Sequence, residues 1–193
     1  KKGRAVTEWA LDARDLGLPQ IRKRIFVIAA PVGRAAELIP PRERKWLVLR
    51  DAIHPDAGFD DPDPEAFPLR RNELLLFAGI PPGGNWNSSR LGRKYAGIRF
   101  RGMRPSGNLL RRLSWDRPAP CVVATKPDGY RTRGATVHPE EPRHLSVGEM
   151  RALQGVSRSH LIAAPHPARI RQVGNGVAVP MAEAVGRAIR AAE

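Results

Sequence analysis

A glutamine and two arginines stand at alternate positions near the start of the chain: Gln20, Arg22 and Arg24. Arg24 opens a short apolar run that extends to Ala30 and is rich in β-branched and aromatic residues, which predicts a buried strand. Because side chains alternate across a strand, Arg22 and Arg24 are expected on one face. A guanidinium group is a fixed, always charged fork of donors that suits a base carbonyl or a phosphate. The alternative is a solvated basic start to a strand.

A second basic group lies between residues 90 and 112, where glycines and aromatic residues are interleaved with it. Arginines in such a stretch can contact phosphate or read guanine in the major groove, and glycines let the backbone approach a duplex closely. The candidate DNA-contacting residues are Arg90, Arg93, Lys94, Arg99, Arg101, Arg104, Arg111 and Arg112. A basic surface loop without sequence readout is the alternative.

The last 50 residues predict two short amphipathic helices joined by a glycine-rich turn. Ser146 and Glu149 have the spacing of a capping box, so a helix is expected to start there. Residues 174–176 read Gly-Asn-Gly and predict a tight turn, after which Pro180 suits the first position of a second helix. That helix would bury one face, made of Met181, Ala184, Val185, Ala188, Ile189 and Ala192.

Composition limits the classes of partner. The chain has 193 residues, with 33 Lys and Arg against 19 Asp and Glu, a net charge of +14. This balance favours a polyanion, and nucleic acid is the first candidate. A membrane surface is disfavoured, because the basic residues are not gathered on one amphipathic helix. No apolar run approaches the roughly 20 residues of a membrane span and no secretory signal is visible, so a cytoplasmic location is expected.

Metal and disulfide chemistry are not expected. A single cysteine, Cys121, excludes an internal disulfide and a cysteine-rich zinc site. The five histidines share no common spacing, and the aspartates between residues 60 and 63 do not have the spacing of a helix-loop-helix calcium site. Residues 56–72, acidic and then basic with three prolines, are expected to form an exposed or partly disordered loop.

Three stretches together resemble one enzyme family. RHLSVGEMRALQG and QVGNGVAVP resemble the last two signature blocks of the DNA (cytosine-5) methyltransferases, and DLGLPQIRKRIFVI resembles the block that precedes their target-recognition domain. The resemblance implies methyl transfer from S-adenosylmethionine to carbon 5 of a cytosine flipped out of double-stranded DNA. It assigns Gln20, Arg22 and Arg24 to support of the flipped cytosine, with Arg24 on the base and Arg22 on a phosphate or a nearby loop. It places Asn175, Gly176 and Val177 beside the cofactor.

The same resemblance implies an α/β fold: the C-terminal part of a Rossmann-like methyltransferase domain plus a small, mostly β and irregular target-recognition domain. Residues 1–50 would be terminal strands of the catalytic domain, and residues 51–142 the target-recognition domain. Residues 143–193 would be closing helices that return to the catalytic domain.

The family's chemistry needs a cysteine thiolate that attacks carbon 6 of cytosine. Pro120-Cys121 has the expected dipeptide, but its flanks, PAPCVVAT, resemble a non-catalytic block in which CVVAT is a strand. We therefore expect Cys121 to be a small buried residue. The sequence also lacks a Phe-x-Gly-x-Gly cofactor loop and a Glu-Asn-Val block. The nucleophile is expected in an upstream part, either a second polypeptide or more of the same chain, without which this chain would be inactive.

Two other functions remain open. One is a non-catalytic DNA-binding module derived from a methyltransferase, and the other is an RNA-binding protein with basic loops. The methyltransferase function and the non-catalytic DNA-binding module both predict DNA binding that weakens with salt.

Overall fold

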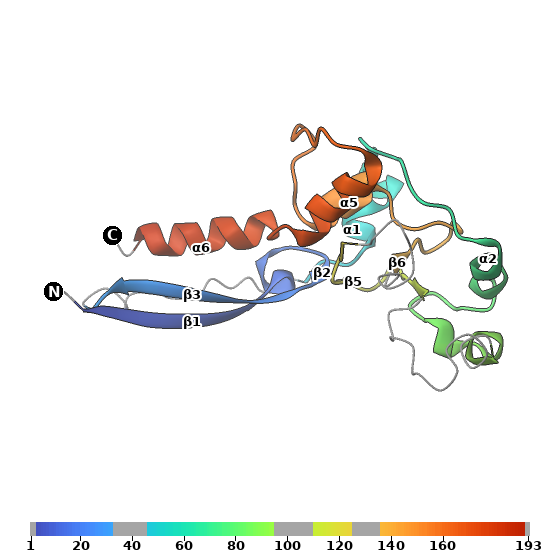
Figure 1. Cartoon of the computed structure of the whole chain (residues 1–193), viewed down its shortest axis with the longest axis horizontal. Coiled ribbons are helices and arrows are strands. Elements are labelled where there is room, and N and C mark those ends of the chain that lie inside the picture. The colour runs from blue at the N-terminus through green and yellow to red at the C-terminus, as the bar shows by residue number, and fades with distance from the viewer. Residues whose placement is uncertain (1–2, 33–45, 95–109, 125–135, 192–193) are drawn as a thin grey trace.

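The computed structural model describes residues 3–32, 46–94, 110–124 and 136–191. It is elongated, with a hairpin and a long helix forming one end and a more irregular lobe forming the other (Figure 1).

The hairpin consists of β1 (Arg4–Asp12) and β3 (Lys23–Pro31), which pair antiparallel along their full length. A short 3-10 helix, η1 (Ala13–Leu16), and the two-residue strand β2 (Gln20–Ile21) lie between them. The prediction of a fully buried strand is wrong, because alternate residues of β3 are exposed: Ile25 by 71% and Val27 by 63%. The reason is that this sheet has two strands among the described residues and only one of its faces is covered.

Helix α6 (Val179–Ala191) covers that face. Its Met181, Ala184 and Val185 share a core with Trp9 and Leu11 of β1. The helical face expected from the sequence is confirmed for its described residues, since Ala188 and Ile189 pack against the same core and Ala192 lies outside the described residues. Pro180 is the second residue of α6 rather than the first.

Within residues 143–191, two helices rather than the expected one precede α6. Helix α4 (Val147–Leu153) starts with the predicted capping box, in which Ser146 Oγ accepts from the Glu149 amide and Glu149 accepts from the Ser146 amide. Helix α5 (His166–Asn175) was not predicted. It starts after Pro165 without a side-chain cap, so the usual polar start signal is missing. Gly174 and Asn175 are its last residues, and the expected tight turn is therefore a helix end followed by an extended Gly176.

The irregular lobe contains α1 (Arg50–Ile53), α2 (Arg71–Phe77), a helical stretch over residues 90–94, and two 3-10 turns, η3 (Pro55–Ala57) and η4 (Trp86–Ser88). Its strands are two residues long: β4 (Arg111–Arg112) runs parallel to β6 (Thr136–Val137), and β5 (Ala119–Pro120) runs parallel to β2. The described part of this lobe is irregular, as expected, but has more helix than strand.

The strand expected over residues 121–125 does not form in its described part, residues 121–124. Its backbone groups are used differently. The Val122 amide donates to Gln20 Oε1 at 2.8 Å, and the Val122 carbonyl accepts from Arg22 Nη1 at 2.8 Å. Side chains rather than a neighbouring strand therefore satisfy this backbone.

The described residues form three buried cores along the molecule. One joins the hairpin to α6. A second joins α1, α4 and α5 to residues 113–122, and a third lies around α2. The division into parts 1–50, 51–142 and 143–193 stays a prediction. The second core contains one leucine from each of these parts: Leu49, Leu113 and Leu145.

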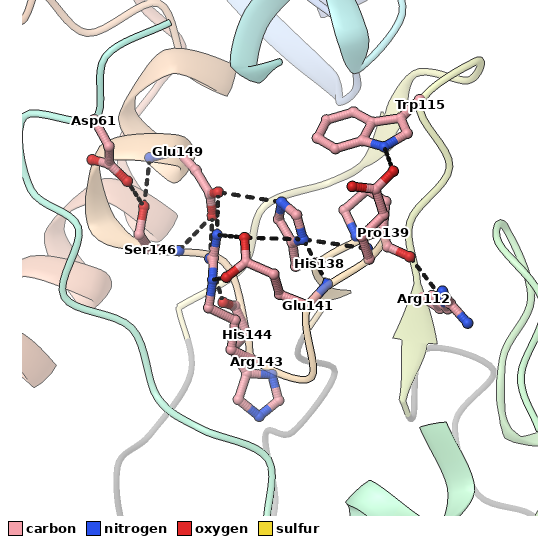
Figure 2. Close-up of polar contacts among 11 residues, drawn as sticks. Asp61, Arg112, Trp115, His138, Pro139, Glu141, Arg143, His144, Ser146 and Glu149 are labelled. Carbon is pink, nitrogen blue, oxygen red and sulfur yellow. Dashed lines mark hydrogen bonds and ion pairs between the residues drawn. The ribbon is translucent and has the colours of Figure 1, made fainter. Parts of the chain in front are cut away.

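A polar network fixes the start of α4 against the irregular lobe (Figure 2). Arg143 donates to both carboxylate oxygens of Glu149 at 2.8 Å and also pairs with Glu141. Ser146 Oγ contacts Asp61, from the acidic loop. The prediction of an exposed loop over residues 56–72 holds only in part, because Leu69 is buried and Asp63 and Glu65 both pair with Arg169 of α5.

Candidate functional site

Gln20 lies at the junction between the hairpin and the rest of the molecule and is completely buried. Its amide nitrogen donates to the Leu153 carbonyl at 2.8 Å, and its amide oxygen accepts from Val122. Both ends of the side chain are therefore used to hold the C-terminus of α4 against residues 119–122. In this position both polar ends of the Gln20 side chain face protein groups.

Arg22 is 1% exposed, and its guanidinium bridges two distant segments. Nη1 donates to the Val122 carbonyl at 2.8 Å, and Nη2 donates to the carbonyls of Gly174 at 3.2 Å and Gly176 at 2.6 Å. Desolvation by burial lowers the pKa of Arg22 from its ordinary value. Nη1 and Nη2 thus both donate to the protein interior, and Nε is buried without a hydrogen-bond partner among the described residues.

Arg24 is half-buried, and its guanidinium lies near Cys121, as does that of Arg22. Its Nη1 donates to the Lys23 carbonyl at 2.7 Å, and its Nη2 lies 3.9 Å from Cys121 Sγ. Arg22 Nη1 lies 3.2 Å from the same sulfur. The expectation that the two arginines reach one side of the chain is met, although Arg22 lies between β2 and β3 rather than in a strand.

Asn175, Gly176 and Val177 form the exposed bend between α5 and α6, with Val177 50% exposed. The bend lies on a close backbone contact, because a Cβ added to Gly174 would be 2.3 Å from the Ala124 nitrogen. Arg22 holds the carbonyls on either side of Asn175. The residues predicted for the cytosine and those predicted for the cofactor are thus adjacent, though they are more than 150 positions apart in the sequence.

The predicted DNA-contacting residues divide into three groups. Arg90, Arg93 and Lys94 are exposed on the helical stretch over residues 90–94. Arg111 is half-buried, and Arg112 is used inside the lobe: its Nε donates to the Pro139 carbonyl at 2.7 Å and its Nη1 to the Ile80 carbonyl at 2.9 Å. The structure thus turns the Arg112 donors inward. Arg99, Arg101 and Arg104 lie outside the described residues.

Sequence reasoning missed two groups at this junction. One is Gln154, whose amide donates to the Val173 carbonyl at 2.8 Å. The other is the Cys121 thiol, which is half-buried rather than buried and lies beside both arginines. The Pro-Cys dipeptide was the only local signal for Cys121. Among the described residues no cluster of His, Cys, Asp and Glu could hold a metal ion, and no helix is long and apolar enough to cross a membrane.

Comparisons with solved structures place the fold. A DNA modification methyltransferase encoded within an E. coli prophage matches 97% of this chain and 60% of its own with a TM-score of 0.60 at 17% identity. A methyltransferase of Entamoeba histolytica matches 95% of this chain and 52% of its own with a TM-score of 0.55 at 12% identity. The fold is therefore that of α/β methyltransferases.

Sequence comparisons then give the family. The model of the C-5 cytosine-specific DNA methylases matches residues 85–191. The type II methyltransferase M.Eco47II of Escherichia coli is 29% identical over 181 residues, which are 89% of this chain and 42% of that protein. The type II methylase M.HgiDII of Herpetosiphon aurantiacus is 27% identical and matches 97% of this chain and 56% of its own length.

The chain belongs to the C-5 cytosine-specific DNA methylase family. It spans about two-fifths to about a half of the length of the curated relatives it matches.

Proposed function

We propose that this chain is the DNA-recognising and cofactor-completing part of a DNA (cytosine-5) methyltransferase. It would act on a cytosine flipped out of double-stranded DNA, with S-adenosylmethionine supplying the methyl group. The observation that carries the proposal is the junction at Arg22, where the predicted cytosine block and the predicted cofactor bend are joined by hydrogen bonds. A methyl transfer requires its two reactants side by side, and this junction brings their predicted supports together.

Within the site, Arg24 is the residue available to a base. Its guanidinium is half-buried, and among the described residues its Nη1 donates to the adjacent Lys23 carbonyl while its Nη2 lies 3.9 Å from Cys121 Sγ. A charged fork in such a position can hold the polar edge of a flipped base. The buried side chains of Gln20 and Arg22 hold this segment in place through their hydrogen bonds to the rest of the protein.

The bend over residues 175–177 fits part of the cofactor. An exposed amide side chain at Asn175, the backbone of Gly176 and the apolar Val177 stand on a fixed support. They offer hydrogen bonds and apolar contact to the methionine moiety. The remainder of the cofactor site would come from the upstream part.

The hairpin supports the need for that upstream part. Val6, Ile25 and Val27 lie on its uncovered face and are each more than 60% exposed. Its strands also have unpaired edges among the described residues, which are ready to accept further strands. Since the chain spans 42% of the length of M.Eco47II, we propose that the upstream part of the methyltransferase covers this face.

The first experiment measures methyl transfer from labelled S-adenosylmethionine to mixed-sequence DNA, with this chain alone and with the polypeptide encoded upstream. Transfer only in the mixture supports the proposal and places the nucleophile outside this chain. Transfer by the chain alone, lost in Cys121→Ser, would instead identify Cys121 as the nucleophile. DNA binding without transfer in either sample would favour the non-catalytic DNA-binding module.

A second experiment tests the residue roles in the active mixture. Arg24→Ala is expected to abolish transfer while binding of non-target DNA stays within about twofold, since most non-specific affinity comes from phosphate contacts elsewhere. Arg190→Ala, on the exposed side of α6, is the matched control. Unchanged turnover in Arg24→Ala would remove Arg24 from the site.

The uncovered face of the hairpin, proposed as the contact with the upstream part, has its own test. Val27→Asp is expected to weaken association with the upstream polypeptide, because it places a charge in an apolar contact. Leu161→Asp is the control, since Leu161 is 88% exposed in the loop between α4 and α5. Equal association of both variants would show that the hairpin face is not the contact.

A further inference from the structure

Arg22 is an unusual group for a protein interior. Its side chain is buried, yet its contacts are with main-chain carbonyls of Val122, Gly174 and Gly176 and with the Cys121 thiol. Burying a cation is costly unless it is well paired. A lysine could not reach these acceptors as one unit, because only a guanidinium presents a planar fork.

Two of the carbonyl groups that accept hydrogen bonds from Arg22 lie at the bend. The carbonyls of Gly174 and Gly176 lie on either side of Asn175, and one nitrogen, Nη2, holds both of them. Carbonyls at a helix C-terminus have no partner within the helix and need one from outside. Arg22 supplies that partner to α5 and fixes how the chain leaves it.

The opposite side of the bend is fixed by packing. Gly174 lies against the backbone of Val123 and Ala124 so closely that a Cβ would be 2.6 Å from the Val123 carbonyl carbon and 2.3 Å from the Ala124 nitrogen. The Val179 amide donates to the Gln154 carbonyl at 3.0 Å just beyond the bend. Asn175 and Val177 are therefore exposed on a segment that is closely packed against residues 123–124.

We propose that Arg22 is a positioning residue for the cofactor bend, and that it neither holds the cytosine nor contacts a phosphate. Its fork sets the conformation of residues 174–176, so that Asn175 and Val177 are presented to the cofactor. Arg24, two residues further along the chain, is then the only one of these two arginines that reaches the base. The identity of the ligand rests on the proposed function, whereas the control of the bend does not.

The first test uses this chain by itself. In Arg22→Lys, hydrogen exchange of the amides from Gly174 to Val179 is expected to accelerate about tenfold or more, as the loss of a charge-assisted hydrogen bond implies. Exchange in the β1–β3 hairpin and in α4 should stay unchanged, which shows that the variant is folded. Arg24→Lys is the matched control, and its bend should exchange like that of the unaltered chain.

The single cysteine gives an independent reading of the same change. Labelling of Cys121 by a maleimide should be faster in Arg22→Lys, because Arg22 Nη1 lies 3.2 Å from the sulfur and shields it. Arg22→Gln serves as a second variant if the lysine does not fold. Unchanged exchange at the bend together with unchanged labelling would overturn the proposal.

The second test uses this chain assembled with the upstream polypeptide. Arg22→Lys should weaken binding of S-adenosylmethionine about tenfold or more and leave the Kd for DNA unchanged, whereas Arg24→Lys should leave cofactor binding unchanged and impair transfer. The reverse pattern would assign Arg22 to the base and overturn the proposal. If the unaltered assembly binds no cofactor, the proposed function fails, and the exchange measurement still decides whether Arg22 holds the bend.

Discussion

At the scale of single residues, Arg143 and Glu149 join the start of α4 to the chain before it. The guanidinium of Arg143 is clamped by Glu149, whose side chain is 4% exposed, and by the more exposed Glu141. These carboxylates raise the pKa of Arg143, with the hydrogen bond to Glu149 as the largest cause. The same Glu149 accepts from the Ser146 amide. One buried carboxylate thus ties the start of α4 to the chain before it.

Replacing Glu149 by Gln should therefore destabilise the fold by about 3 kcal/mol, because it leaves a partly buried cation without its main partner. Glu141→Gln is the matched control, since Glu141 pairs with the same arginine but its side chain is 58% exposed. It should cost about 1 kcal/mol or less. Urea unfolding followed by circular dichroism measures both, and equal losses would contradict the role given to Glu149.

His138 makes the same network sensitive to acid. Its Nδ1 accepts from the amides of Glu140 and Glu141, and its Nε2 lies 3.7 Å from Glu149 (Figure 2). Burial lowers its pKa below the ordinary value of 6.5, an effect that the attraction of Glu149 opposes and the charge of Arg143 reinforces. Below about pH 6.5 the unfolded chain therefore binds more protons at this position than the folded chain.

Stability should consequently fall as the pH is lowered from 7.5 to 5.5, with the loss beginning near the unfolded pKa of His138. His138→Gln keeps an acceptor for the two amides and removes the titration, so its urea midpoint should change less over this range. The range stays above the region where Glu141 titrates, whose pKa the Arg143 hydrogen bond lowers further from 4.5. Parallel pH profiles for the two proteins would show that His138 is not the group responsible.

At the scale of elements, local signals predicted α4 and α6 because each carries its own evidence in the sequence. Ser146 and Glu149 mark one start, and six apolar positions mark the buried face of the other. Helix α5 has neither signal and is fixed by contacts from far away, including the pairing of Arg169 with Asp63. The strand predicted over residues 121–125 does not form in its described part for a similar reason, because the side chains of Gln20 and Arg22 form hydrogen bonds with the Val122 backbone.

Two helical glycines separate these local and distant causes. Gly174→Ala should destabilise the chain by about 2 kcal/mol, because the added methyl group meets the backbone of Val123 and Ala124. Gly186→Ala, in α6, meets nothing within 4 Å and should stabilise the chain by about 0.5–1 kcal/mol through helix propensity. Thermal unfolding compares the two directly, and a stabilising Gly174→Ala would mean that α5 does not approach residues 123–124 as described.

At the scale of the whole molecule, charge and family were predictable from the sequence, but the arrangement of the site was not. The arginines and the Gly-Asn-Gly segment could each be named as candidates. Nothing in the sequence indicated that Arg22 is turned inward or that Cys121 lies beside Arg24, because such facts depend on contacts across about 100 residues or more.

The net charge of +14 makes a prediction at this scale. DNA affinity of this chain should fall at least about tenfold between 50 and 200 mM salt, since each neutralised phosphate releases a counterion. Replacing the exposed Arg90, Arg93 and Lys94 by Ala should reduce the slope of log K against log salt, whereas Arg112→Ala should not. Fluorescence anisotropy with a labelled duplex measures both slopes. A Kd that does not change with salt would count against every nucleic-acid function considered.

The first strand and the last helix lie together at one end of the molecule. Ala30, at the end of β3 that is paired with the start of β1, packs in the same core as Ile189 of α6. A polypeptide joined before β1 and one joined after α6 would thus emerge from the same place. The proposed remaining part of the methyltransferase could be encoded before this segment, after it or in a separate gene, and still reach the same hairpin face. The proposed assembly would then have the same geometry whichever side of this segment the remaining part is joined to.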